Sequence, residues 1–178
     1  SDCEDKSPFH AGVVEITGYL CNALTAGLSD DDPQDEAIKN TLTQCAGFLG
    51  ADFAQFMPVL LERLVTDANL EVDFKMQSAD LPETSGNDSH VIKVKGMGEQ
   101  RVSLKTEALV RKVGAFALMD QVSENMGTAF APYCEALLPI VTQHMVYPHN
   151  KSVRKFALRT FNNILVAIGE PNNIPLLQ

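Results

Sequence analysis

The apolar residues of this chain recur every three or four positions over six stretches, which is the spacing of one face of an α-helix. The stretches cover residues 8–28, 33–49, 52–68, 106–126, 128–147 and 152–168. Asp32 is expected to cap the second helix, with Pro33 at its first position. Pro58 falls within the third stretch, so we expect that helix to bend or break there.

Between the third and fourth predicted helices the helical period stops. Residues 77–89 are polar and contain Pro82 and Gly86, which is typical of a loop. The next two segments, 90–95 and 100–104, alternate between apolar and polar residues on either side of a turn with two glycines. This pattern predicts a β-hairpin, and because an isolated hairpin is marginally stable, we expect it to pack on the helices.

The helical pattern contains an internal repeat. Residues 49–56 resemble residues 126–133 at an offset of 77, and the offset continues from Leu60–Leu61 to Leu137–Leu138. Helix pairs of about 40–47 residues indicate HEAT repeats, whose pairs stack into a solenoid. We therefore predict an all-α HEAT-repeat α-solenoid of about three helix pairs with a small β-hairpin insertion. The predicted units are repeats at 8–50, 51–127 and 128–170, an insertion at about 70–104, and the start of a truncated repeat at 171–178.

The terminal units show no polar capping face of the kind that solenoids usually carry. We therefore expect a fragment of a longer solenoid, and a complete three-repeat protein is the alternative. The 178 residues are 45% hydrophobic and 21% charged, with a net charge of −9. An acidic chain disfavours direct binding of nucleic acid or anionic membranes and favours basic proteins, although the charge also serves solubility. No apolar run is long enough to insert into a membrane.

The sequence contains no motif for catalysis, metal binding or a cofactor. It lacks the GxxxxGKS/T and HExxH patterns, and the GxG at residues 96–98 is interpreted as a hairpin turn. His144 and His149 are interpreted as a surface pair, and Cys134 lies about 15 Å from His144 along one predicted helix. Cys21, Cys45 and Cys134 lie among apolar residues of the predicted helices and are interpreted as small apolar residues, whereas Cys3 lies near the start of the sequence. We expect no enzyme activity.

The polar residues of the second helices are the candidates for partner binding, since second helices line the inner face of a HEAT solenoid. These partner-facing candidates lie off the apolar stripes: Glu36, Lys39, Asn40, Thr43, Gln121, Glu124, Lys155, Arg159, Asn162 and Asn163. Arg111 and Arg154 are predicted to tie neighbouring repeats together. The aromatic residues at 53, 56, 130 and 133 are predicted to belong to the core, and grooves for phenylalanine side chains are the alternative.

Three segments carry a family resemblance: residues 30–34 (DDDPQ), 48–53 (FLGADF) and 56–60 (FMPVL). In this order they resemble the importin-beta superfamily, most closely the importin-five branch, also called karyopherin beta three. The hairpin insertion within one repeat, followed by Leu104-Lys105-Thr106, also resembles that branch, and the resemblance covers about residues 8–170. Asn150 departs from the pattern, since such repeats often carry Asp at this turn.

This resemblance implies a nuclear import receptor that shuttles between the cytoplasm and the nucleus through the nuclear pore. Such receptors bind basic cargo, often ribosomal proteins or histones, and contact phenylalanine-glycine nucleoporins. They release cargo when Ran-GTP binds. The alternative is a HEAT-repeat scaffold of another multiprotein complex, of the phosphatase or assembly-factor type.

Overall fold

The computed structural model describes residues 8–26, 32, 34–72, 74–78, 88–94, 98–104 and 106–169, and between residues 73 and 107 it describes the backbone alone. The elements are α1 (His10–Thr25), α2 (Gln34–Leu49), the 3₁₀ helix η1 (Gly50–Phe56), α3 (Met57–Ala68), β1 (Phe74–Ser78), β2 (Asp88–Val94), β3 (Gly98–Leu104), α4 (Thr106–Met126), the 3₁₀ helix η2 (Gly127–Phe130), α5 (Ala131–His144) and α6 (Lys151–Gly169). The predicted start of a further repeat at 171–178 lies outside the described residues, as do Cys3, Pro33 and the predicted turn residues Gly96 and Met97.

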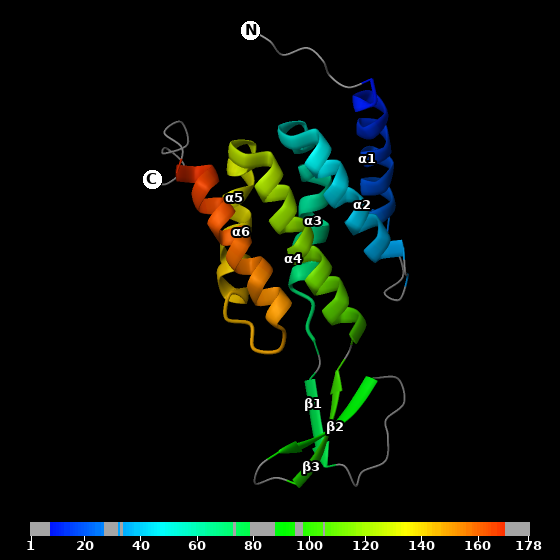
Figure 1. The fold of residues 1–178 in the computed structure, drawn as a ribbon, viewed down its shortest axis with the longest axis vertical. Helices are drawn as coiled ribbons and strands as arrows, with labels where there is room; N and C mark the ends of the chain where they lie inside the picture. Colours follow the sequence, from blue (N-terminus) through cyan, green and yellow to red (C-terminus); the bar gives the residue numbers. More distant parts are fainter. Residues whose placement is uncertain are drawn as a thin grey trace.

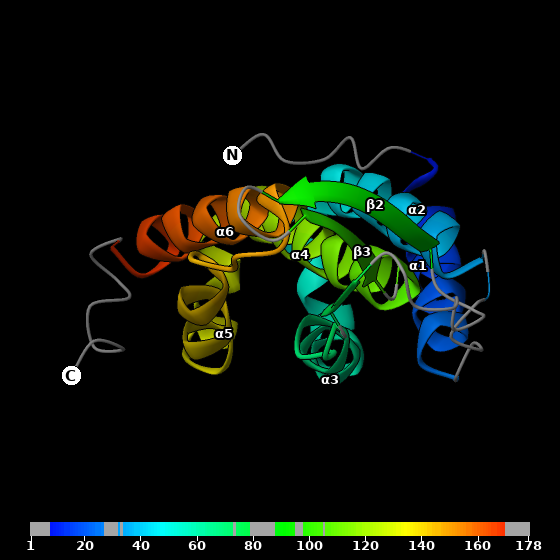
Figure 2. The same ribbon diagram turned by 90° about the horizontal axis from the view of Figure 1, so that it is seen from below.

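The six α-helices form two layers (Figures 1 and 2). Helices α1, α3 and α5 make one layer, and α2, α4 and α6 make the other. Each helix of the first layer is followed by a helix of the second layer that runs back beside it. Helix α4 packs against both α2 and α6. This arrangement is a HEAT-like α-solenoid, as the sequence predicted.

The core lies between the two layers. The largest fully buried side chains of the core are Leu24, Leu42, Phe53, Met57, Leu60, Leu64, Phe116, Leu118, Met119, Phe130, Leu137 and Ile164. Complete burial of one such side chain contributes about 1.5–3 kcal/mol. The helices pack both within a pair and between neighbouring pairs. Helix α4, for example, contacts α3 of its own pair and α2 and α6 of the pairs on either side.

The helix ends depend on a few residues. The Asp32 carboxylate accepts a hydrogen bond from the backbone N–H of Gln34 at 2.9 Å, which confirms the predicted cap. The predicted break near Pro58 is confirmed, because the stretch divides into the 3₁₀ helix η1 and α3, and Pro58 lies in the first turn of α3. A proline is tolerated there, since its missing N–H has no partner in the helix. Gly50 and Gly127 end α2 and α4 with φ values of +54° and +53°, which favour glycine.

The insertion between α3 and α4 is a three-stranded antiparallel sheet with the order β1-β3-β2. Its β2 and β3 pair from Asp88↔Leu104 to Val94↔Gly98, and β1 pairs with the other edge of β3 from Phe74↔Leu104 to Ser78↔Gln100. The insertion is therefore not the lone hairpin that the sequence predicted. In Figure 1 the sheet projects from one end of the helices, so the expectation that it packs along them was wrong.

Candidate functional site

The second-layer surface, formed by α2, α4 and α6, carries the candidates for partner binding, and their exposure divides them. Six side chains are exposed: Glu36, Asn40, Glu124, Lys155, Arg159 and Asn162. Three are half-buried: Thr43, Gln121 and Asn163. Lys39 is buried. The exposed residues can reach a partner directly, whereas the others interact within the chain.

A polar cluster joins α4 to α6 on this surface. Arg159 lies between two acids of α4, with Nε 3.1 Å from Asp120 Oδ2 and Nη2 3.0 Å from Glu124 Oε2. Asn163 donates hydrogen bonds to the Asp120 carbonyl at 3.1 Å and to the Ser123 hydroxyl at 3.0 Å. Burial raises the pKa of Asp120 above its ordinary range, although Arg159 opposes the shift. The exposed rim of this cluster, Glu124 and Arg159, is available to a partner, while Asn163 serves the packing of the two helices.

The prediction for Lys39 as a partner-facing residue was wrong. Its ammonium group lies 2.6 Å from Asp35 Oδ2 and 2.7 Å from Asp67 Oδ2, and only 3% of the side chain is exposed. Gly114 of α4 leaves room for it, because a Cβ at that position would lie 3.2 Å from Lys39 Cδ. The lysine therefore neutralises two buried acids and does not reach the surface.

Asp67 is the centre of this buried ionic cluster, which joins α2, α3 and α4. Besides Lys39, it accepts hydrogen bonds from Arg63 Nε at 3.1 Å and from Arg111 Nη2 at 2.7 Å. Arg63 also contacts Asp35 at 3.0 Å. Burial alone raises the pKa of Asp67, but the hydrogen bonds and charges of Lys39, Arg111 and Arg63 outweigh it, so the net shift is downward.

Two arginines were predicted to tie neighbouring repeats together, and the structure gives each of them a contact within its own helix pair. Arg111 binds a carboxylate of the preceding helix, within the pair α3/α4. Arg154 Nη1 donates to the Tyr147 carbonyl at 2.7 Å and to the Pro148 carbonyl at 3.3 Å, within the turn between α5 and α6. Contacts between pairs include those of Lys39 with Asp67, Arg63 with Asp35 and Arg159 with Asp120.

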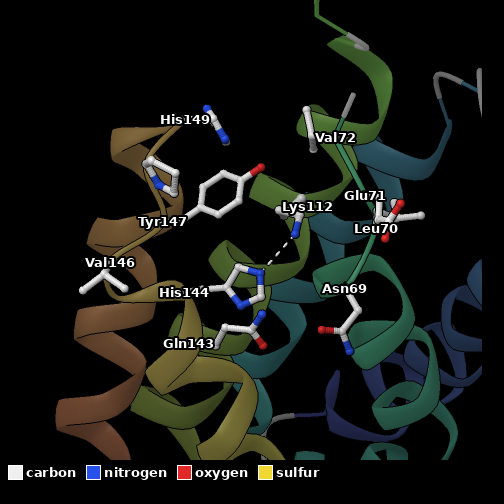
Figure 3. A pocket seen from close by; sticks show the side chains of 11 residues that line it. Asn69, Leu70, Glu71, Val72, Lys112, Gln143, His144, Val146, Tyr147 and His149 are labelled. Atoms are coloured by element: carbon white, nitrogen blue, oxygen red, sulfur yellow. Dashed lines mark hydrogen bonds between the residues drawn. The ribbon is translucent and has the colours of Figure 1, made fainter. Parts of the chain in front are cut away.

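The interpretation of His144 as a surface residue was wrong. It is buried at the end of α5, where Nδ1 lies 2.8 Å from the Ile140 carbonyl and Nε2 lies 3.0 Å from Lys112 Nζ (Figure 3). With its proton on Nδ1, the neutral ring donates a hydrogen bond to the Ile140 carbonyl. The unprotonated Nε2 then accepts a hydrogen bond from the Lys112 ammonium. Burial lowers the pKa of His144, and the Lys112 charge lowers it further against the opposing hydrogen bond to Ile140.

This shift predicts a loss of stability in mild acid. In the unfolded chain His144 has its ordinary pKa of about 6.5, so below that pH the unfolded state binds a proton that the native state does not. The free energy of unfolding should therefore fall as the pH drops below about 6.5, by at most about 1.4 kcal/mol per pH unit for this group. Urea unfolding of the wild type and of His144→Gln from pH 7 to pH 5 measures the effect.

The variant is expected to be less stable at neutral pH but to have a shallower pH dependence. Gln143→Ala is the matched control, because it removes an exposed neighbour that does not titrate and should keep the wild-type slope. Equal slopes in wild type and His144→Gln would show that this histidine does not contribute.

The interpretation of the cysteines and aromatic residues is confirmed for the part of the chain that is described. Cys21, Cys45 and Cys134 are buried free thiols, and burial raises the pKa of Cys21 to about 12 and that of Cys134 to about 11. Phe53 and Phe130 are fully buried. The Tyr133 hydroxyl donates to the Ala54 carbonyl at 3.0 Å, which connects the two 3₁₀ helices.

Among the described residues, no group of three or more His, Cys, Asp or Glu side chains has the geometry to hold a metal ion. None of the helices that the structure describes has the length and hydropathy that a membrane-spanning segment needs. The exposed candidates of the second-layer surface are two acids, two amides and two basic side chains.

Solved structures identify the fold. The chain matches the structure of Kap121p bound to Ste12p with a TM-score of 0.66 and 20% identity over 95% of its length. It matches Kap121p bound to Nup53p with a TM-score of 0.64 and 19% identity, and Kap121p bound to RanGTP with 0.63 and 20%, each over 95% of this chain. The chain shares its fold with part of a karyopherin.

The match covers 16% of each Kap121p chain, so the present chain spans about a sixth of the length of those structures. No family model matches the sequence. At about 20% identity the likeness concerns the fold, and it leaves the partners of this chain to be argued from its own surface.

Proposed function

We propose that this chain is a segment of a nuclear transport receptor of the importin-beta superfamily. The observation that carries the proposal is the match of 95% of the chain to Kap121p, which has been solved with Ste12p, Pho4p, Nup53p and RanGTP. We infer that the receptor containing this segment binds protein cargo, nucleoporins and Ran-GTP, and shuttles between the cytoplasm and the nucleus through the nuclear pore. The residues of the resemblance favour the importin-five branch.

The charge of the chain supports basic cargo of the kind that ribosomal proteins and histones represent. The net charge is −9, and the second-layer surface carries the exposed acids Glu36 and Glu124. Exposed acids attract a basic segment over about a Debye length, about 8 Å at physiological salt. The half-exposed Arg159 pairs with Glu124, so a basic cargo would have to compete with that arginine for the carboxylate.

The test is a binding assay with the receptor that contains this segment. Ran loaded with GTP and with GDP is compared in the presence of a histone-tail peptide as basic cargo. We expect selective binding of Ran-GTP together with release of the peptide. Equal binding of the two nucleotide states, by a receptor shown to be folded, would favour the HEAT-repeat scaffold instead.

The role of the second-layer surface is tested with the double variant Glu36→Lys/Glu124→Lys. Reversing two exposed charges should cost roughly 1–2 kcal/mol, or about 5–30-fold in cargo affinity. The matched control is Glu62→Lys/Glu135→Lys, which makes the same charge change on α3 and α5 of the other layer, where both side chains are exposed. If both double variants weaken cargo equally, the effect comes from net charge and not from this surface.

A further inference from the structure

A pocket lies where the chain leaves α3 and where it turns from α5 into α6 (Figure 3). Its volume is about 700 Å³, which is within the usual range of ligand sites. One wall is the segment 69–72 that follows α3, and the other is the end of α5 with the turn that follows it, residues 143–149. Lys112 of α4 lies between the two walls.

Lys112 is a buried cation, with 3% of its surface exposed. An ammonium group has three N–H donors. Among the described residues, its hydrogen-bond acceptor is His144 Nε2 at 3.0 Å, and its other close partner is the face of the Tyr147 ring, 4.9 Å from Nζ to the ring centroid. No ion pair joins Lys112 to a carboxylate of the described residues, unlike Lys39, which has two such pairs.

A buried charge without a counter-charge is costly, and a carboxylate is the ligand that relieves the cost most directly. The rest of the lining agrees with a carboxylate on an organic stem. Leu70, Val72, Val146 and Tyr147 provide apolar and aromatic surface, and Asn69 and Gln143 provide amide donors. A phosphate fits less well, because Lys112 is the single Lys or Arg among the residues that line the pocket and Glu71 adds a negative charge.

We propose that this pocket binds a carboxylate group of a partner peptide, with the Lys112 ammonium as its anchor. The carboxylate comes from an acidic side chain or from a chain terminus, and both present the same two oxygens to Lys112. His144 Nε2 accepts a hydrogen bond from the ammonium and holds it in place, and the face of the Tyr147 ring packs against the ammonium as well. Glu71, which is exposed and lines the pocket, adds a negative charge that repels an anionic ligand. The proposal does not depend on binding of Ran or nucleoporins.

The test is a nuclear magnetic resonance titration of the isotope-labelled chain, following the Lys112 side chain and the His144 ring. Three probes are compared: N-acetyl-glutamate methylamide with a side-chain carboxylate, N-acetyl-leucine with a terminal carboxylate, and N-acetyl-glutamine methylamide, which is neutral. We expect saturable shifts from a carboxylate probe at concentrations up to about 50 mM and none from the neutral one. The probe that binds more tightly identifies the source of the carboxylate.

Variants then assign the binding to Lys112. Lys112→Met should weaken the carboxylate probe by at least about tenfold, whereas Lys155→Met, which removes an exposed lysine of α6, should leave it unchanged. Glu71→Gln should strengthen binding by about two- to threefold, because it removes a negative charge from the lining of the pocket. This variant keeps the test decisive if Lys112→Met fails to fold. Equal shifts with the neutral probe, no saturable shift with either carboxylate, or no gain in Glu71→Gln would overturn the proposal.

Discussion

Asp67→Ala is expected to lower the free energy of unfolding by about 3–5 kcal/mol, because it leaves buried cations without their counter-charge. The carboxylate is fully buried and accepts hydrogen bonds from Lys39, Arg63 and Arg111. Lys39 is itself buried and would keep Asp35 alone as its partner. The expected loss is a large part of the 5–15 kcal/mol that stabilises a typical domain. Urea unfolding followed by circular dichroism at neutral pH measures it.

Two further variants make this prediction specific. Asp52→Ala is the matched control, because it removes a half-exposed carboxylate hydrogen-bonded to the His10 ring at 2.9 Å, and should cost less than about 1 kcal/mol. Adding Lys39→Met to Asp67→Ala should recover part of the loss, with a coupling energy of about 1–3 kcal/mol. A loss in Asp67→Ala no larger than in Asp52→Ala would show that the cluster is not buried in solution.

The helices could be predicted because their signal is local. An apolar stripe that repeats every three or four residues indicates which face of the helix is buried, and it does so without knowledge of the element that packs against it. The prediction placed α4 at residues 106–126, which is where the structure has it. The starts of α3 and α5 were harder to predict from the sequence. Over a single turn, a 3₁₀ helix and an α-helix have similar spacings of apolar residues, so the pattern does not show where one ends and the other begins. The prolines at positions 58 and 132 were the available signal, since proline favours the first turn of a helix.

The buried ionic cluster could not be predicted from the stripe alone. Lys39 lies off the stripe of its helix and was assigned to the surface, but its burial depends on Asp67, which is 28 residues away. Two local signals pointed in this direction without settling it. Asp35 and Lys39 are four residues apart, as are Arg63 and Asp67, so each helix presents a paired charge on one face.

The sequence pattern did contain a signal for two other features that were predicted differently, the burial of His144 and strand β1. Leu137, Val141 and His144 are separated by four and three residues, so His144 continues the buried stripe of α5. A histidine was assigned to the surface because of its polarity, whereas Lys112 and the Ile140 carbonyl satisfy its nitrogens. Strand β1 alternates Phe74 and Met76 with polar residues, but five residues are too short to separate a strand from a loop.

The second-layer surface could be predicted in outline, because the helical period of apolar residues that marks the buried face also marks the exposed face. Six of the ten partner-facing candidates are exposed, and the four others have polar partners within the chain. Polarity alone does not distinguish a side chain that meets solvent from one that meets a neighbouring helix. Arg159 does both, since it is 45% exposed and pairs with two acids of α4. Such residues connect adjacent helix pairs of a solenoid and remain partly exposed to solvent.

Phe53→Ala is expected to lower the free energy of unfolding by about 3–5 kcal/mol, the usual loss for a fully buried phenylalanine. The Phe53 ring is completely buried, and its centroid lies 5.6 Å from that of the Phe56 ring. Both residues belong to η1, the 3₁₀ helix that connects α2 to α3. Phe130 occupies the corresponding place in η2, 6.0 Å from Tyr133, and Phe130→Ala should cost a similar amount. Urea unfolding of both variants measures the two losses under the same conditions.

The control for this pair is Phe48→Ala, which removes a ring of the same size at the end of α2 that is 48% exposed. It should cost about 1 kcal/mol or less, since much of the ring is already in contact with water. Equal losses at positions 53 and 130 would mean that the offset of 77 residues marks equivalent positions in packing as well as in sequence. A loss at position 53 close to that of Phe48→Ala would contradict the buried position of the ring. A large loss at only one of positions 53 and 130 would show that the two connecting 3₁₀ helices, η1 and η2, are packed differently.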